Sequence, residues 1–235
     1  MNPVVFIHTN DQQLLAARLC AYSLKARSTH ADKFDVGLLR LEETPHLYPG
    51  REGRRYICDG RIFTWHNRDL QSFAPLRMMV PQVMGFQGKA LVLDPDIFAV
   101  GDVHDLLRRD MNGKSILCRK RDGWYHGKRT LTYSTAVMLL DCARLSHWCW
   151  SDDIDALFAM RLDLATWLYL HAESPETIGP IEEEWNHLDT LTERTQLLHN
   201  TERLTQPWKT GLAVDFDLDA QGAYPYRPGF HPRSD

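Results

Sequence analysis

The sequence contains no apolar run long enough to cross a lipid bilayer. A membrane-spanning helix needs roughly 20 consecutive apolar residues, and no stretch of the 235 residues approaches that length. The first residues form no basic region followed by a long apolar core, so we expect no signal peptide. The sequence therefore predicts a protein without an integral membrane segment.

Cysteine is scarce and irregularly placed. The five cysteines are odd in number and no two have the CxxC spacing of a zinc knuckle. Several lie inside apolar runs, as Cys142 does at the end of residues 137–142. Buried, reduced thiols are typical of cytoplasmic proteins. We therefore predict a cytoplasmic location and five free thiols, namely Cys20, Cys58, Cys118, Cys142 and Cys149.

A net positive charge and several common catalytic motifs are also missing. The net charge is -4, so no overall basic field attracts nucleic acid, and the locally basic residues 51–55 and 119–121 are interpreted as solvated loops. The phosphate-binding pattern GxxxxGK[ST], the dinucleotide pattern GxGxxG and the nucleophile elbow GxSxG are all absent. These absences argue against nucleic-acid binding and against three large enzyme classes.

What the sequence does contain is an alternation of short apolar runs and segments of helical periodicity. The predicted strands cover residues 4–7, 34–41, 90–93, 115–118, 135–141 and 196–199. The predicted helices cover residues 12–26, 73–84, 103–109, 143–150 and 154–170, with a loop at residues 43–60. Asn10 or Asp11 should cap the first helix, and Pro81 should bend or restart the second. The pattern predicts an α/β fold with a mostly parallel central sheet flanked by helices.

Polar residues follow three of the predicted strands, at residues 8–11, 94–96 and 199–200. Ligands on open α/β sheets bind at the carboxyl ends of the strands. We therefore expect these three segments to converge on one site.

Asp94 and Asp96 are the most informative pair in these segments. In an extended segment, residues i and i+2 project to the same side, and two carboxylates there need a cation or water between them. Oxygen ligands suit Mg²⁺ or Mn²⁺, and Pro95 stiffens the segment that presents them. The alternative is an acidic surface turn that closes a strand.

The segment around this pair resembles a known family. Residues 73–107 contain Arg77 four residues before Pro81, an apolar strand, Asp94 and Asp96, and a helix that begins near Asp105. This order is similar to the central segment of glycosyltransferase family 8 and its bacterial relatives. Similar segments occur in the family's order along most of the chain, at residues 4–28, 132–141, 181–188 and 198–211.

The resemblance implies a fold, a reaction and a set of site residues. The fold would be GT-A, with Asp-x-Asp at a strand end. The reaction would be Mn²⁺- or Mg²⁺-dependent transfer of a hexose, with retention, from a nucleotide diphosphate sugar to a glycan, lipid or protein acceptor. UDP is the nucleotide that the resemblance favours. The metal ligands implied are Asp94, Asp96 and His199. The residues implied in nucleotide-sugar binding are His8, Thr9, Asn10, Arg77, Asp94 and Lys209, and the implied catalytic residue on the acceptor side is Asp163.

Several alternatives stay open beside these assignments. Arg77 and Asp163 could be ordinary helix surface residues, and Trp185 could be a core residue rather than a sugar platform. The family's Asn-Ser-Gly is Ser134-Thr135-Ala136 here, and Lys209 follows Gln206-Pro207-Trp208 in place of Lys-Pro-Trp.

Other functions and the domain organisation complete the expectations. Asp-x-Asp also occurs in haloacid-dehalogenase-type phosphatases. Those enzymes need a Thr or Val two residues beyond the second Asp, whereas Ile97-Phe98 follows Asp96 here. A non-catalytic sugar-nucleotide or glycan-binding module on the same fold is the alternative function. We expect one GT-A-like domain over residues 1–219 and an irregular tail over residues 220–235.

Overall fold

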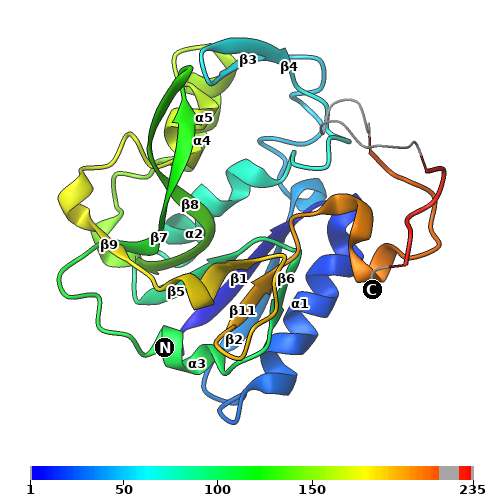
Figure 1. Cartoon of the computed structure of the whole chain (residues 1–235). Helices are drawn as coiled ribbons and strands as arrows, with labels where there is room; N and C mark the ends of the chain where they lie inside the picture. Colours follow the sequence, from blue (N-terminus) through cyan, green and yellow to red (C-terminus); the bar gives the residue numbers. More distant parts are fainter. Residues whose placement is uncertain (1, 217–227, 234–235) are drawn as a thin grey trace.

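A six-stranded sheet forms the centre of the computed structural model, which describes residues 2–216 and 228–233 (Figure 1). In spatial order its strands are β2 (Asp35–Arg40), β1 (Val4–Thr9), β5 (Lys89–Leu93), β8 (Lys128–Asp141), β7 (Ile116–Tyr125) and β9 (Ile178–Pro180). Within this sheet β8 runs antiparallel to both of its neighbours, and the other pairs are parallel. The mostly parallel sheet predicted from the sequence is confirmed.

The alternation of side chains along the central strands divides the core into two layers. Val5 and Ile7 of β1 pack on one face, against α1 (Leu14–Arg27) and α3 (Val103–Leu107). Phe6 of β1 and Val92 of β5 point to the other face, which is covered by η3 (Ala74–Met79), α2 (Val80–Val83), α4 (Trp150–Phe158) and α5 (Leu164–Leu168). Burial on both faces explains why these strands are continuous apolar runs.

The first strand and helix form as their sequence predicts. Asn10 accepts a hydrogen bond from the backbone N–H of Gln13, 3.1 Å away, and so caps the short 3-10 helix η1 (Asp11–Gln13) that leads into α1. The helix predicted over residues 73–84 is a 3-10 helix followed by one α-helical turn. Pro81 lies at the start of that turn, where its missing N–H costs little, so the predicted restart is confirmed.

Two other helix predictions were wrong. Residues 143–150 hold only the end of the 3-10 helix η4 (Cys142–Arg144), and α4 begins at Trp150. The helix predicted over residues 154–170 is broken, because Met160 has a positive φ of 57° and Asp163 caps a new helix by accepting from the backbone N–H of Ala165.

The loop predicted at residues 43–60 contains a strand. β3 (Arg55–Cys58) pairs with β4 (Arg61–Thr64) around Asp59 and Gly60, whose φ angles are 51° and 73°. Asp-Gly is the two-residue turn that antiparallel hairpins favour. β7 and β8 form a second, longer hairpin around His126 and Gly127, at φ 49° and 72°, so both strands extend beyond their predicted ends.

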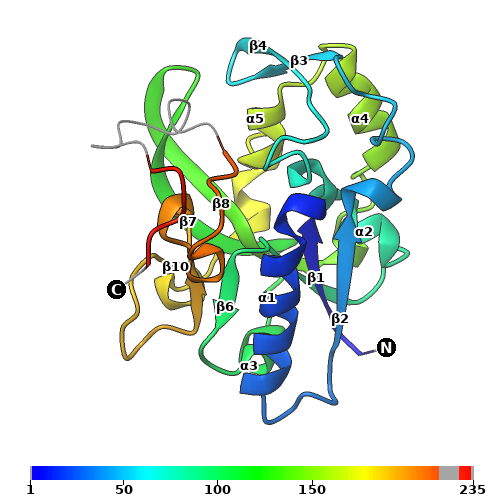
Figure 2. The same ribbon diagram turned by 90° about the vertical axis from the view of Figure 1, so that its right-hand side faces the viewer.

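A small second sheet joins segments that are distant in the chain. It consists of β10 (His187–Leu188), β11 (Leu197–His199) and β6 (Ile97–Ala99), and His199 is paired with Ile97. Figure 2 shows β6 and β10 on the α1 side of the sheet. The remaining 3-10 helices are η2 (Leu41–Glu43), η5 (Pro175–Thr177), η6 (Glu183–Asn186), η7 (Arg203–Thr205) and η8 (Pro207–Lys209).

The described part of the predicted tail packs on the segment before it. His231 exchanges backbone hydrogen bonds with Gly211 and Leu212, and its ring is 2% exposed. Residues 220–227 and 234–235 lie outside the described residues, so the predicted boundary at residue 219 stays a prediction. None of the described helices combines the length and apolar character that a membrane span requires.

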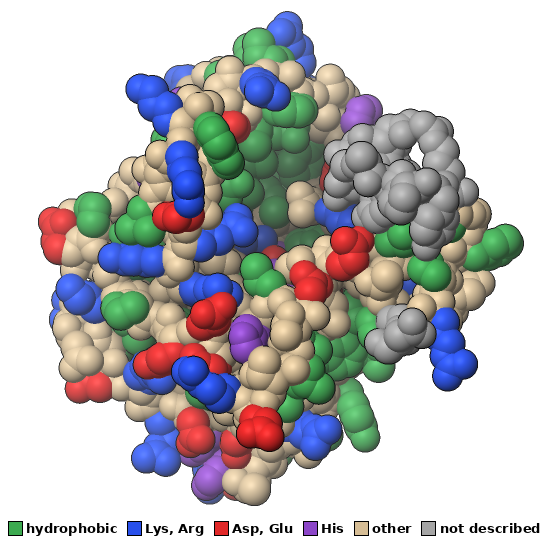
Figure 3. Space-filling view, viewed as in Figure 1, with side chains coloured by type: hydrophobic (Ala, Val, Ile, Leu, Met, Phe, Trp, Pro, Cys, Tyr) green, Lys and Arg blue, Asp and Glu red, His purple; other side chains and the backbone are tan. Residues whose placement is uncertain are grey.

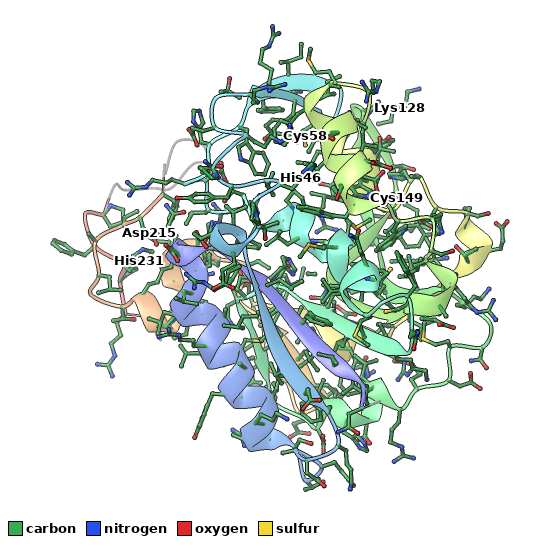
Figure 4. All side chains as sticks on the ribbon, turned by 180° about the vertical axis from the view of Figure 1, so that it is seen from behind. His46, Cys58, Lys128, Cys149, Asp215 and His231 are labelled. Atoms are coloured by element: carbon green, nitrogen blue, oxygen red, sulfur yellow. The ribbon has the colours of Figure 1, made fainter. Side chains whose placement is uncertain are left out.

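The five cysteines are all free in the structure, as predicted. Cys58 and Cys149 lie well apart in Figure 4, and Cys20, Cys118 and Cys142 are buried.

Candidate metal centre and cleft

Three predicted ligands converge at one edge of the central sheet. Asp94 follows β5, Asp96 precedes β6 and His199 ends β11, and one ligand atom from each lies within 4.8 Å of the others. Pairing of β11 with β6 causes this convergence, because it brings residue 199 beside residue 97. Two carboxylates and an imidazole form a donor set that suits Mn²⁺, and Mg²⁺ less well.

Asp94 is held by two basic residues. Its Oδ1 atom lies 2.7 Å from His8 Nε2 and 2.9 Å from Arg77 Nη2. Burial acts to raise the pKa of Asp94, but Arg77 and then His8 and His199 outweigh it, so its pKa lies below the ordinary value. Asp94 is therefore ionised and can serve as a ligand over the whole physiological pH range.

His199 is oriented by a buried amide. Its Nδ1 atom lies 2.9 Å from Asn186 Oδ1, and Asn186 Nδ2 donates to Ser134 Oγ at 2.9 Å. An acceptor at Nδ1 places the proton there and leaves the Nε2 lone pair to face the carboxylates. That Nε2 atom lies 3.3 Å from Asp96 Oδ1. Burial acts to lower the pKa of His199, but the charge of Asp96 outweighs it and raises the pKa.

Arg77 is a buried residue that supports the site. It is 7% exposed and donates from Nε to the carbonyl of Ala74 at 3.0 Å, from Nη1 to Thr135 Oγ1 at 2.5 Å and from Nη2 to Asp94. Thr135 in turn donates to the carbonyl of Leu168 at 2.9 Å. Three fixed donors define the position of the guanidinium, so the alternative of a surface helix residue is excluded.

Gln206 supports Asp96 in the same way. Its side chain is 1% exposed, and Nε2 donates to Asp96 Oδ2 at 3.3 Å and to the carbonyl of Asn200 at 2.9 Å. Sequence reasoning missed this role and that of Asn186. Both residues stand in segments that matched the family pattern, but spacing alone did not show which side chains they touch.

The end of β1 and the residue after it lie beside the site, where His8 contacts Asp94. His8, Thr9 and Asn10 are at most 1% exposed. The side chain of Asn10 donates to the carbonyl of Asp69 at 2.9 Å and to Ser72 Oγ at 3.1 Å, and burial is the main cause of the lowered pKa of His8. Their predicted contact with a nucleotide stays a prediction.

A cleft of about 310 Å³ is lined by two of the three ligands, Asp94 and His199. A second cavity of about 200 Å³ adjoins it and shares Gln71, Ala74, Leu168 and Tyr169. Figure 3 shows the molecule hollowed beside the β7–β8 hairpin. The cleft is lined by Gln71, Phe73, Ala74, Arg77, Asp94, Arg121, Tyr133, Ser134, Thr135, Ala136, Leu168, Tyr169, Leu188, His199 and Thr201.

Two predicted site residues have other partners in the structure. Lys209 is 4% exposed and its Nζ atom lies 2.8 Å from Asp215 Oδ2. Asp215 also lies 3.4 Å from His231 Nε2, and Figure 4 shows these two residues side by side. The predicted contact of Lys209 with phosphate stays a prediction.

Asp163 binds backbone rather than facing the three ligands. Its Oδ1 atom accepts from the N–H groups of Asp59 and Ala165 at 2.9 and 2.8 Å, and its Oδ2 atom accepts from that of Gly60 at 2.7 Å. His126 Nε2 lies 3.1 Å from Oδ2. The predicted catalytic role stays a prediction, and the observed contacts give Asp163 a structural one. Trp185, 7% exposed, packs in the core layer of α1, in line with the core interpretation.

Comparison with known proteins gives matches in structure and none in sequence. No model of a protein family matches the chain, and no curated protein matches it either. The glycosyltransferase GlyE of Streptococcus pneumoniae TIGR4 aligns with a TM-score of 0.59 and 14% identity over 88% of this chain and 56% of its own. The chain thus spans little more than half the length of GlyE.

Two further glycosyltransferase structures match over most of their own length. The galactosyltransferase LgtC, solved with donor and acceptor sugar analogues, aligns with a TM-score of 0.54 and 14% identity over 88% of this chain and 89% of its own. Mouse xyloside xylosyltransferase 1 aligns with a TM-score of 0.54 and 14% identity over 86% of this chain and 98% of its own. The chain therefore has the GT-A-like fold of these glycosyltransferases, as its sequence predicted.

Proposed function

We propose that the protein transfers a sugar from a nucleotide diphosphate sugar to an acceptor, with a divalent cation held by Asp94, Asp96 and His199. The observation that supports this most is the convergence of these three residues, within 4.8 Å, beside a cleft that Asp94 and His199 line. Asp94 directly follows β5, and the carboxyl ends of strands are where open α/β sheets bind ligands. The GT-A-like fold adds to that support, although fold alone does not determine activity.

Each of the three ligands is oriented by a buried neighbour. Arg77 holds Asp94, Gln206 holds Asp96 and Asn186 holds His199. Such contacts fix ligand geometry before the cation arrives, which reduces the reorganisation that binding requires. A bound divalent cation would offset the negative charge that develops on the departing diphosphate.

The cleft offers further groups for the donor and acceptor. Arg121 supplies a positive charge on one wall, and the hydroxyl groups of Ser134 and Tyr133 lie on the same strand, β8. We assign UDP as the nucleotide, Mn²⁺ as the metal, a hexose as the sugar and retention as the outcome, because the sequence resemblance favours each. The acceptor would be a glycan, a lipid or a protein.

Calorimetry of UDP binding with and without Mn²⁺ tests the proposal. Asp96→Asn removes one ligand charge and should weaken Mn²⁺-dependent UDP binding at least tenfold, or about 1.4 kcal/mol. Asp105→Asn is the matched control, because Asp105 is an exposed aspartate on α3, outside the three-ligand cluster. UDP binding of equal strength in both variants, without a need for metal, would contradict the proposal.

A binding module without catalysis is the second candidate. The contacts of Asp163 favour it, because both carboxylate oxygens are already occupied by backbone N–H groups. Nuclear magnetic resonance of UDP-hexoses incubated with the protein and Mn²⁺ separates the two functions. Slow release of free sugar supports transfer, since water can replace the acceptor, whereas tight binding without any hydrolysis or transfer supports the module.

A further inference from the structure

The β3–β4 and β7–β8 hairpins meet at the end of the molecule above the cleft (Figures 1 and 2). The N–H of His126, in the turn of β7–β8, donates to the carboxylate of Asp59, in the turn of β3–β4. Asp163 accepts from both residues of the β3–β4 turn and contacts the His126 ring. The two turns are therefore tied to each other, and we call residues 54–64 and 119–131 together the hairpin surface.

Charge is concentrated on the hairpin surface. Its two segments contain eight lysines and arginines against two aspartates, a net charge of +6 in a chain whose total is -4. The rest of the chain is accordingly acidic. Figure 3 shows Lys and Arg side chains gathered around these two hairpins.

Most of these cations form no ion pair with any residue that the structure describes. Arg119 pairs with Glu183 at 2.7 Å, and Arg129 pairs with Asp122 at 2.9 Å. Among the described residues, no ion pair involves the other six cations, which are Arg54, Arg55, Arg61, Lys120, Arg121 and Lys128. Lys120 also lies over the Tyr133 ring, with its Nζ atom 5.6 Å from the ring centroid. The β7–β8 register places Lys120 on the face of Trp124, and Arg121 and Lys128 on the other face. Cations without an acidic partner thus lie on both faces of the hairpin, which favours an anionic partner at its end.

The same surface exposes large apolar side chains. Trp124 is 67% exposed and Leu131 is 50% exposed. The β7–β8 register places Trp124 opposite Arg129 and Leu131 opposite Asp122, so both apolar side chains project from the same face of the hairpin. On β4, Ile62 and Phe63 are 54% and 45% exposed.

We propose that the hairpin surface binds the surface of a membrane that contains anionic phospholipid. Cations alone would also fit a soluble polyanion, but exposed Trp and Leu beside them suit the headgroup region of a bilayer, where the ring and the apolar chain leave water. Lys and Arg near an anionic leaflet each strengthen binding by roughly fivefold. The proposal is independent of the proposed sugar transfer, because it needs neither metal nor nucleotide.

Vesicle co-sedimentation with the full chain tests this proposal. The protein should sediment with vesicles of phosphatidylcholine and phosphatidylglycerol, much less with phosphatidylcholine alone, and less at high salt. Lys120→Glu/Lys128→Glu should weaken binding at least tenfold, because two attractive charges become repulsive. Arg18→Glu/Arg27→Glu on α1 makes the same charge change outside the hairpin surface and should have little effect.

The apolar contribution has its own matched pair of variants. Trp124→Ser/Leu131→Ser should weaken vesicle binding at least fivefold. Leu15→Ser/Tyr22→Ser on α1 is the control, because these side chains are 50% and 73% exposed. Thermal melts establish that each variant is folded.

Three outcomes would overturn the proposal. They are equal binding to neutral and anionic vesicles, equal losses in the α1 controls, and unchanged vesicle binding by the Trp124 and Leu131 variant. The last outcome, with displacement from vesicles by soluble polyphosphate, would instead indicate a soluble polyanion as the partner. UDP binding with Mn²⁺, measured on the same variants, should remain unchanged.

Discussion

Asn186 should control metal affinity although it is not itself a ligand. In Asn186→Ala the Nδ1 atom of His199 loses its acceptor at 2.9 Å, and with it the preference for the tautomer that frees Nε2. Residues that orient a metal-bound histidine in this way typically contribute 10- to 100-fold in affinity. Asn186 is 1% exposed and His199 is 8% exposed, so water cannot easily replace the lost amide. We therefore expect the Mn²⁺ affinity to fall about 30-fold or more, which corresponds to about 2 kcal/mol.

Two companion variants separate this effect from general destabilisation. Asn186→Asp keeps an acceptor at Nδ1 and adds negative charge, so it should retain most of the Mn²⁺ affinity. Ser134→Ala removes only the hydrogen bond that Asn186 Nδ2 donates, and should cost less than about fivefold, the usual contribution of one neutral hydrogen bond. Calorimetric Mn²⁺ titration of the four proteins makes the comparison. Equal affinities in the wild type and Asn186→Ala would refute the orienting role, and equal losses in Asn186→Ala and Ser134→Ala would assign the effect to packing.

Three further predictions concern pH, the hairpin contact and the thiols. The pKa of His199 is raised in the folded protein, so its contribution to the stability of the metal-free protein is full below about pH 6.5 and is lost as the pH rises through the folded pKa. The Mn²⁺ affinity should increase over the same pH range, because only the neutral ring binds metal. Melting curves and Mn²⁺ titrations of the wild type and His199→Gln check both directions. Asp163→Ala should lower the free energy of unfolding by about 2 kcal/mol, because three backbone N–H groups lose their acceptor. Urea unfolding in which Asp163→Ala is as stable as Asp163→Asn would contradict this. Alkylation under denaturing, non-reducing conditions should label all five cysteines, and a protected pair seen by mass spectrometry would show a disulfide instead.

The central strands and the first helix could be predicted because single-element patterns determine them. The run from Val5 to Ile7 is buried on both faces, and Asn10 caps the helix that follows. The Asp94 and Asp96 pair was recognisable for the same reason, since it directly follows a continuous apolar strand.

Features that depend on contacts between distant segments could not be predicted. The hydrogen bonds of Arg77 to Thr135 and of His199 to Asn186 join residues 58 and 13 positions apart, and no local pattern encodes them. The β3–β4 hairpin was missed although Asp59-Gly60 is a turn signal, because the charged residues around it suggested a loop. The break after α4 was missed because the apolar periodicity of residues 154–170 continues across Met160. This residue has a positive φ, but it is not a glycine, so the sequence gives no sign of the break.

The pairing of β6 with β11 has a consequence for the order of folding. Asp96 and His199 are 103 positions apart in the chain and meet only when these two strands pair. Closing so long a loop is entropically unfavourable, so this contact belongs to a late step of folding. The three-ligand site would then be absent from the folding transition state. A bound cation should slow unfolding while leaving the refolding rate nearly unchanged, so the metal would lengthen the lifetime of the native protein without guiding its formation.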